Sequence, residues 1–248
     1  MGEVSVAAAA AELGVSKRQV TRLARAGDLD VTREVGGVLL LDSSSVHRWA
    51  QMRRLSGRPW SEAVAWAALA VLSGQDADWI SPSQSTRLRH RLRRSDAEDV
   101  AFFARRRAVT LRMRSWGGTD EYAIGQYFTY TGVSALDKES GMASRFGLAT
   151  IRSGRTDGYV NADELDAAVE NLGLTDDLDG DMTVRVVTGK NPYFASIAKH
   201  ETTAVAATTN AAEAVSIAAV ALDLMESLDT RERSAGARVL QELIDALP

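Results

Sequence analysis

The opening fifty residues alternate between runs with helical spacing and runs with strand spacing. Ser5–Leu13 is rich in alanine and predicts a short helix, which ends in a turn at Gly14 and Val15. Residues 16–26 predict a second helix with an apolar stripe along one face. The stripe consists of Val15, Val20 and Leu23.

The second helix carries signals for both of its ends. Ser16 and Gln19 stand three residues apart, which is the spacing of a capping box and fixes a helix start. Gly27 suits a helix end because glycine adopts the left-handed conformation at little cost. Away from the apolar stripe, this helix carries the polar and basic residues Lys17, Arg18, Gln19, Thr21, Arg22 and Arg25.

A predicted β-hairpin follows the second helix. Val31–Val35 and Val38–Leu41 have high β-propensity, and Gly36 and Gly37 separate them. Two-residue hairpin turns require positive φ, which glycine supplies. This hairpin would be the wing of a winged helix-turn-helix, where Arg33 would contact the DNA backbone.

A third helix is expected to complete this first unit. Asp42 is a suitable N-cap for a helix that covers roughly Ser43–Arg54. At helical spacing, its inward side carries Val46, Trp49 and Ala50. The order of helix, turn, basic helix, hairpin and helix predicts a winged helix-turn-helix.

A basic helix that follows a short turn has a defined mechanism on DNA. It can enter the major groove, where arginine and glutamine reach base edges while flanking cations hold phosphates. The alternative is a helical hairpin whose basic face is only solvated. DNA binding is favoured because the turn, the caps, the hairpin and the next helix all occur in the required order.

The same order of motifs resembles the DNA-binding domain of excisionase and MerR-type proteins. The Ala-rich helix, LGVS at the turn, the basic helix, AGDL, the hairpin and HRWA follow one another as in that domain. The resemblance covers about the first fifth of the chain and implies a winged DNA-binding fold. One departure is Thr21-Arg22-Leu23, where members of the family usually carry an aromatic residue.

Thr86–Arg94 is the densest basic run of the chain. As a helix it would place Leu88 and Leu92 on one face. Another face would carry Arg87, Arg91 and Arg94. That face would either lie along DNA phosphates, through Arg87 and Arg91, or be an ordinary solvated surface, and the sequence favours neither.

Caps and periodicity predict further elements along the rest of the chain. Trp60–Leu72 reads as a core helix, Ser95 caps another helix, and Ala108–Trp116 alternates like a strand. The later elements are a helix at Asn161–Leu172, a strand at Asp181–Val187, a long helix from Asn210 and a last helix capped by Asp229. The expected fold class is α+β and mainly helical, with the winged helix-turn-helix followed by a larger mixed α/β domain.

Charge is distributed unevenly along the chain. Residues 1–114 carry 19 Lys and Arg against 12 Asp and Glu, whereas residues 115–248 carry 10 against 21. The net charge of −4 therefore combines a basic half with an acidic half. We expect a winged DNA-binding domain at 1–55, a basic helical linker region at 56–115 and an acidic α+β effector domain at 116–248.

Composition argues against several kinds of chemistry. The chain has no cysteine, and its three histidines, His47, His90 and His200, are isolated from one another. The acidic cluster at 176–181 lacks the glycine and glutamate of a calcium loop, and residues 188–190 lack the glycine spacing of a P-loop. We therefore expect no metal, no cofactor and no enzymatic activity. No signal peptide or membrane-length apolar run is present in the sequence, so a cytoplasmic location is expected.

Three segments of the acidic half, taken in order, resemble a second family. They are Tyr130–Leu136, the strand at Met182–Val187 and the ending Ala219–Leu243. Their order is similar to that of the AbiEi-like transcriptional antitoxins of type IV toxin–antitoxin pairs. The resemblance implies repression of the protein's own operon and a nucleotidyltransferase-like toxin as a partner. The usual N-terminal winged domain of that family is of a different type from the one here.

One function is favoured and two alternatives stay open. The favoured function is a sequence-specific transcriptional regulator, an autorepressing antitoxin that binds double-stranded DNA of its own promoter, with a homodimer supplying a second half-site contact. The first alternative is a ligand-sensing regulator whose pocket would be lined by aromatic residues that are more typical of a core, namely Tyr122, Tyr127, Phe128 and Tyr130. The second is an excisionase-type recombination accessory factor, against which the extra acidic half argues.

Overall fold

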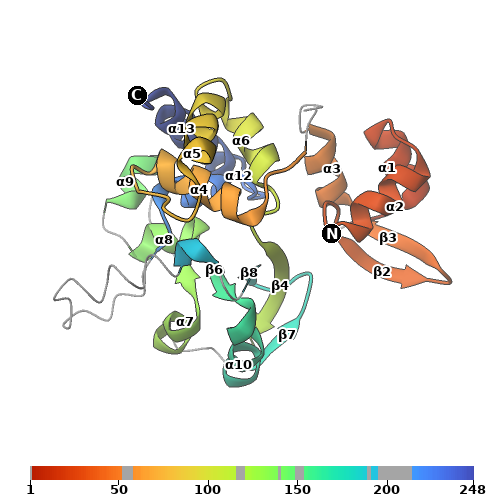
Figure 1. The fold of residues 1–248 in the computed structure, drawn as a ribbon. Helices are drawn as coiled ribbons and strands as arrows, with labels where there is room; N and C mark the ends of the chain where they lie inside the picture. Colours follow the sequence, from red (N-terminus) through yellow and green to blue (C-terminus); the bar gives the residue numbers. More distant parts are fainter. Residues whose placement is uncertain are drawn as a thin grey trace. The chain divides into compact units, whose positions relative to one another are not determined.

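The computed structural model describes residues 2–51, 58–115, 121–138, 141–148, 154–188, 191–194 and 214–248. The chain divides into two compact units, Met1–Ser56 and Gly57–Pro248 (Figure 1). Each unit combines helices with a sheet, which confirms the predicted α+β class.

The first unit packs three helices against a three-stranded sheet. Its elements in chain order are β1 (Glu3–Ser5), α1 (Val6–Leu13), α2 (Lys17–Arg25), β2 (Val31–Val35), β3 (Val38–Asp42) and α3 (Ser43–Gln51). The sheet order is β1-β3-β2, and both pairings are antiparallel. Sequence reasoning missed β1, because a strand of three residues carries too little pattern to detect.

Local signals set the ends of α2 as expected. The Ser16 hydroxyl oxygen accepts a hydrogen bond from the Gln19 backbone N–H at 3.2 Å. At the other end Gly27 has φ +74°, and the Asp28 N–H donates to the Leu23 carbonyl at 2.9 Å. This is the Schellman arrangement that ends helices at glycine.

The hairpin turn between β2 and β3 forms as predicted. Gly36 and Gly37 both have positive φ, as a tight two-residue turn requires.

Helix α3 differs from the prediction at one inward position. Val46 is fully buried, but Ala50 is exposed, so the prediction that Ala50 faces inward is wrong. Ser45 takes an inward position instead, because its hydroxyl accepts from the Asp30 N–H at 3.1 Å and donates to the Asp42 carbonyl at 3.0 Å. Residues 52–54 of the expected helix lie outside the described part of the chain.

The second unit places helices around a five-stranded sheet. Its helices are α4 (Glu62–Leu72), α5 (Pro82–Leu92), α6 (Ala97–Ala104), α7 (Glu121–Tyr127), α8 (Gly132–Lys138), α9 (Met142–Phe146), α10 (Ala162–Leu172), α12 (Ile217–Met225) and α13 (Thr230–Asp245). Its strands are β4 (Val109–Ser115), β5 (Thr129–Tyr130), β6 (Thr156–Asn161), β7 (Leu174–Asp176) and β8 (Met182–Val187). The sheet order is β5-β6-β8-β4-β7, and β6 and β8 form the parallel pair.

The expected division at residues 115 and 116 falls inside this second unit. Strand β4 lies within the sheet, between β8 and β7, so it pairs with the acidic half on both sides. One hydrophobic core also runs from Trp60 to Ile244 and includes α4, which is buried from Ala65 to Leu72. The basic region, which ends with β4, and the acidic region after it therefore share a sheet and a core.

Two helix starts in this unit differ from the sequence prediction. Helix α5 begins at Pro82, where Ser81 and Gln84 form a capping box, rather than at Thr86. Helix α6 is capped by Asp96 rather than by Ser95, because Asp99 completes the box one residue later than expected. The predicted start of the long helix at Asn210 lies outside the described residues, within which α12 begins at Ile217.

Candidate nucleic-acid interface

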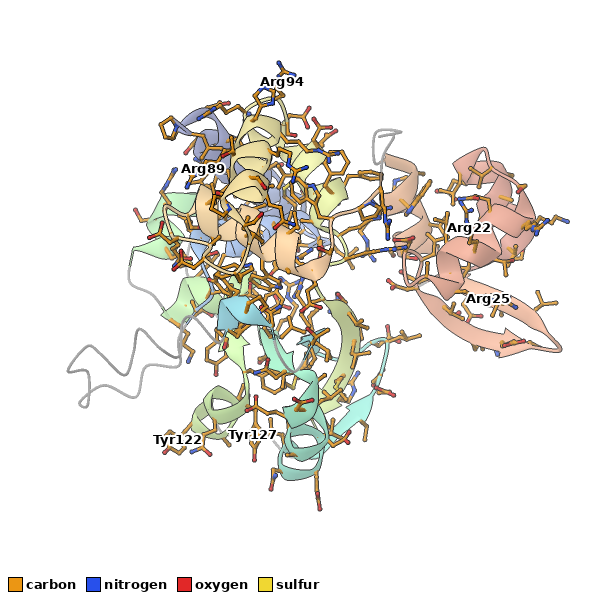
Figure 2. All side chains as sticks on the ribbon, in the orientation of Figure 1. Arg22, Arg25, Arg89, Arg94, Tyr122 and Tyr127 are labelled. Atoms are coloured by element: carbon orange, nitrogen blue, oxygen red, sulfur yellow. The ribbon has the colours of Figure 1, made fainter. Side chains whose placement is uncertain are left out.

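Helix α2 turns one face to the core and the opposite face to solvent. Val20 and Leu23 pack inward with exposed fractions of 0% and 7%. A helix turns about 100° per residue, so Arg18, Arg22 and Arg25 share the opposite side, where all three are exposed. Figure 2 shows Arg22 and Arg25 projecting from this helix. At spacings of four and three residues, the three guanidinium groups form a row, which we call the α2 arginine row.

The other predicted residues of α2 flank this row. Lys17 is exposed at the start of the helix, whereas Gln19 and Thr21 are half-buried on its two sides. The Thr21 hydroxyl donates to the Lys17 carbonyl at 3.1 Å, so its oxygen stays available as an acceptor. The structure therefore brings all six predicted residues of α2 to one surface.

Nothing in the described residues neutralises the charge of this surface. Helix α2 contains no acidic residue, and no described side chain forms a hydrogen bond or ion pair with the basic groups of Lys17, Arg18, Arg22 or Arg25. The two other described cations of the unit are paired, Arg33 with Glu3 at 2.8 Å and Arg48 with Asp30 at 3.1 Å. The uncompensated positive charge is thus concentrated on α2, where an external anion can meet it.

Arg33 on the wing has a partner within the protein. Its Nε donates to Glu3 Oε1 at 3.0 Å and its Nη2 to Glu3 Oε2 at 2.8 Å. Since Glu3 lies on β1 and Arg33 on β2, the pair crosses the central strand and joins the two edges of the sheet. The hydrogen bond from Arg33 holds the pKa of Glu3 below its usual range. The expected contact of Arg33 with the DNA backbone stays a prediction, and it requires the guanidinium to leave or share Glu3.

Arg87 and Arg91 belong to the second unit, on α5. Leu88 and Leu92 anchor this helix with 5% and 0% exposure, while both arginines are exposed, as the two-face pattern predicts. Arg87 Nε donates to the Ser83 carbonyl at 3.1 Å. The Arg91 guanidinium lies 4.0 Å from the centre of the Phe103 ring, stacked rather than paired with an acid. A role for both in DNA binding stays a prediction.

The aromatic residues considered for a ligand pocket have different environments. Phe128 and Tyr130, each 3% exposed, are part of the core around the sheet. Tyr127 packs partly against that core, whereas Tyr122 is 59% exposed (Figure 2). Two of these four aromatic residues, Phe128 and Tyr130, are therefore core residues.

A buried charged cluster in the second unit was not anticipated from the sequence. Arg107, Tyr159, Arg185 and Asp223 come from four different segments, and each is at most 4% exposed. The Asp223 carboxylate accepts hydrogen bonds from Arg107 and, at 2.9 Å, from the Tyr159 hydroxyl, and Arg185 Nε lies 3.2 Å from it. The Thr131 hydroxyl donates to the other carboxylate oxygen. No motif links these residues, because 116 positions separate Arg107 from Asp223.

Glu226 extends this cluster to the surface. Its carboxylate lies 2.8 Å from Arg107 Nη2 and 3.1 Å from Arg185 Nη2, and its side chain is 40% exposed. Burial opposes ionisation of Glu226, but the two guanidinium groups outweigh it and lower its pKa to about 2. Burial likewise opposes the charge of Arg107 and Arg185, and the carboxylates outweigh it and raise both pKa values. With two cations and two anions, the cluster is balanced and ties α12 to the sheet.

Two further properties concern the described residues only. Among them, no three His, Asp or Glu side chains are grouped so as to hold a metal ion. None of the helices in this part of the chain has the length and hydropathy needed to cross a membrane.

Comparison with known proteins identifies the first unit. Residues 3–54 match the family model described as a helix-turn-helix domain. This match covers α1, the turn, α2, the wing and α3, and it suggests DNA binding. No curated protein and no solved structure matches the chain.

Proposed function

We propose that this protein is a sequence-specific DNA-binding transcriptional regulator that reads its site with α2. The observation that carries the proposal is the α2 arginine row, three exposed guanidinium groups without a neutralising partner among the described residues of the unit. They stand on the second helix of a helix-turn-helix, which is the helix that enters the major groove in such domains.

Roles within the row follow from position along the helix. Residues near the N-terminus of a recognition helix reach base edges, so Lys17 and Arg18 are placed for base contacts. Arg22 stands one turn after Arg18 on the same face, and we propose that it reads the neighbouring base. Arginine forms bidentate hydrogen bonds with the O6 and N7 atoms of guanine. Arg25, in the last turn, would hold a phosphate, and so would Arg33 once it is released from Glu3.

One winged unit provides a small interface of about 600–1,000 Å², which limits affinity and specificity. We propose that two copies bind two half-sites about one helical turn apart, as in other helix-turn-helix proteins. The protein would then repress its own promoter when it occupies both half-sites.

The biological setting that we propose is a toxin–antitoxin operon. Its support is the resemblance of Tyr130–Leu136, Met182–Val187 and Ala219–Leu243 to AbiEi-like antitoxins. A nucleotidyltransferase-like toxin would be the partner, and this chain would carry no catalytic activity of its own. Coexpression tests this part separately, because an antitoxin restores growth to cells that express its toxin.

The test of DNA reading compares two single substitutions in the full chain. Arg22→Ala removes one group of the row, and Arg231→Ala removes an exposed arginine of α13 without altering the winged unit. If Arg22 reads a base, its loss costs about 1–3 kcal/mol, or about 5- to 150-fold in affinity for the protein's own upstream DNA. Arg231→Ala should leave this affinity unchanged. Equal affinities of the two variants would remove Arg22 from the base-reading set.

A further inference from the structure

Helix α5 carries a second basic surface, separate from the α2 arginine row. Its basic run contains Arg87, Arg89, His90, Arg91, Arg93 and Arg94, and no acidic residue occurs between positions 79 and 95. Leu88 and Leu92 fix the helix to the core of the second unit, so the basic side chains face outward or sideways. We call these five arginines the α5 arginine cluster.

Three members of this cluster have no partner among the described residues. No hydrogen bond or ion pair joins the guanidinium groups of Arg89, Arg93 or Arg94 to another described side chain or carbonyl. Arg93 and Arg94 are exposed and Arg89 is half-exposed, and Figure 2 shows Arg89 and Arg94 projecting from the helix. The arginines singled out from sequence, Arg87 and Arg91, are the two that the protein holds through Ser83 and Phe103.

Folding alone does not account for five arginines in this place. Cations near the end of a helix gain about 0.3–1 kcal/mol from its dipole, which would favour one or two of them. Like charges four residues apart repel, as at Arg87 with Arg91 and at Arg89 with Arg93. The repulsion and the dipole gain are of similar size, so they give folding no net reason to place five arginines here, whereas an anion outside the described residues would stabilise the cluster.

We propose that the α5 arginine cluster binds the phosphate backbone of duplex DNA without reading its sequence. The guanidinium group of arginine is a planar fork that binds phosphate through two parallel hydrogen bonds, and the cluster offers five of them. The Arg91 guanidinium stacks on Phe103 and Trp60, at 4.0 and 5.8 Å from their ring centres, and this restraint reduces the side-chain entropy lost on binding. The winged unit lies in the same chain, so its binding would raise the effective concentration of DNA around α5.

This inference adds a second DNA contact to the one proposed for α2, and it rests on the proposed function for the identity of the anion. The two helices would have different roles. Helix α2 would set which site is bound, and α5 would add affinity that depends on salt and is equal on all sequences. The prediction therefore concerns the salt slope rather than the specificity.

The test uses the full chain and two double variants with the same net charge. Arg93→Ala/Arg94→Ala removes two exposed charges from the cluster, and Arg231→Ala/Arg233→Ala removes one exposed and one half-buried charge from α13. Fluorescence anisotropy measures affinity for the protein's own upstream duplex and for a scrambled duplex between 50 and 300 mM salt. Each lost phosphate contact reduces the slope of log K against log salt by about 0.9, so the first variant should lose about 1.8 on both duplexes. The control variant should keep the slope of the unmodified protein.

The measured salt slopes test the α5 contact, and the comparison of the two duplexes tests the proposed regulator. A slope that is unchanged in Arg93→Ala/Arg94→Ala overturns the inference and leaves the cluster to an acidic protein partner. A loss confined to the upstream duplex also overturns it, because the contact would then be sequence-specific. If the unmodified protein binds both duplexes equally, the proposed regulator fails, yet the slopes still decide whether α5 touches DNA. Thermal unfolding of both variants checks that neither substitution disturbs the fold.

Discussion

Asp223→Ala removes the carboxylate at the centre of the buried cluster. Asp223 accepts hydrogen bonds from Arg107, Tyr159 and Thr131, and Arg185 Nε lies 3.2 Å away. Without it, the two buried guanidinium groups share Glu226 as their one carboxylate partner among the described residues, and the Glu226 side chain is 40% exposed. Removing one partner of a buried ion pair costs about 3–5 kcal/mol, because the remaining charge stays desolvated. The hydroxyls of Tyr159 and Thr131 also lose their acceptor, so the upper part of this range is expected.

Trp66 lies beside the cluster and contributes to the tryptophan fluorescence of the chain. Its indole N–H donates to the Arg107 carbonyl at 3.1 Å, and its ring lies 4.6 Å from that of Tyr193. Urea unfolding followed by tryptophan fluorescence should show a lower midpoint with an unchanged slope. In a unit of this size, a loss of 3–5 kcal/mol corresponds to a fall in Tm of about 6–20 °C.

The matched control is Asp166→Ala on α10, which removes an exposed carboxylate. A surface change of this kind stays within about 0.5 kcal/mol. If Asp223→Ala costs no more than Asp166→Ala, the cluster does not tie α12 to the sheet and the reasoning is refuted.

Three further predictions follow from individual contacts. The pKa of Glu226 falls from 4.5 when unfolded to about 2 when folded, so its contribution is present above pH 4.5 and is lost as pH falls toward 2. Since its side chain is 40% exposed, solvent screening limits that contribution to about 1 kcal/mol. The urea midpoint of Glu226→Gln should therefore change less between pH 5 and pH 3 than that of the unmodified protein. Glu3→Gln should release Arg33 and raise DNA affinity a few-fold at low salt. Adding Arg33→Gln should abolish this gain, and a gain that persists in the double variant would show that Arg33 does not contact DNA. Gly236→Ala would place a Cβ 2.4 Å from the Ala221 carbonyl oxygen, so α12 and α13 must separate at a cost of about 1–3 kcal/mol, whereas the exposed Ser234→Ala should have little effect on Tm.

Local signals were sufficient to predict helices α1 and α2 and the hairpin of the first unit. The Ser16 cap, the left-handed Gly27 and the pair Gly36 and Gly37 each act within four residues, so the sequence contains the whole interaction. Ala50 was placed wrongly because the inward face of α3 includes Ser45 rather than Ala50. The burial of Ser45 accompanies a hydrogen bond with Asp30, fifteen residues away, which the local pattern does not show.

Long-range contacts explain what sequence reasoning missed. Glu3 and Arg33 are thirty residues apart, and only the pairing of both strands with β3 brings them together. The cluster around Asp223 depends on the order of strands in the sheet, which charge patterns do not encode. The division expected at residue 115 followed the change of charge, whereas the core follows apolar residues on both sides of it.

We propose that the winged unit, Met1–Ser56, reads a specific DNA site. A mobility shift of the full chain on its own upstream DNA, with scrambled duplex as competitor and across a salt series, tests this proposal. We expect a complex that survives excess competitor and that Arg22→Ala weakens. Binding that the scrambled duplex displaces equally well would contradict it, since the α2 arginine row would then hold phosphates alone.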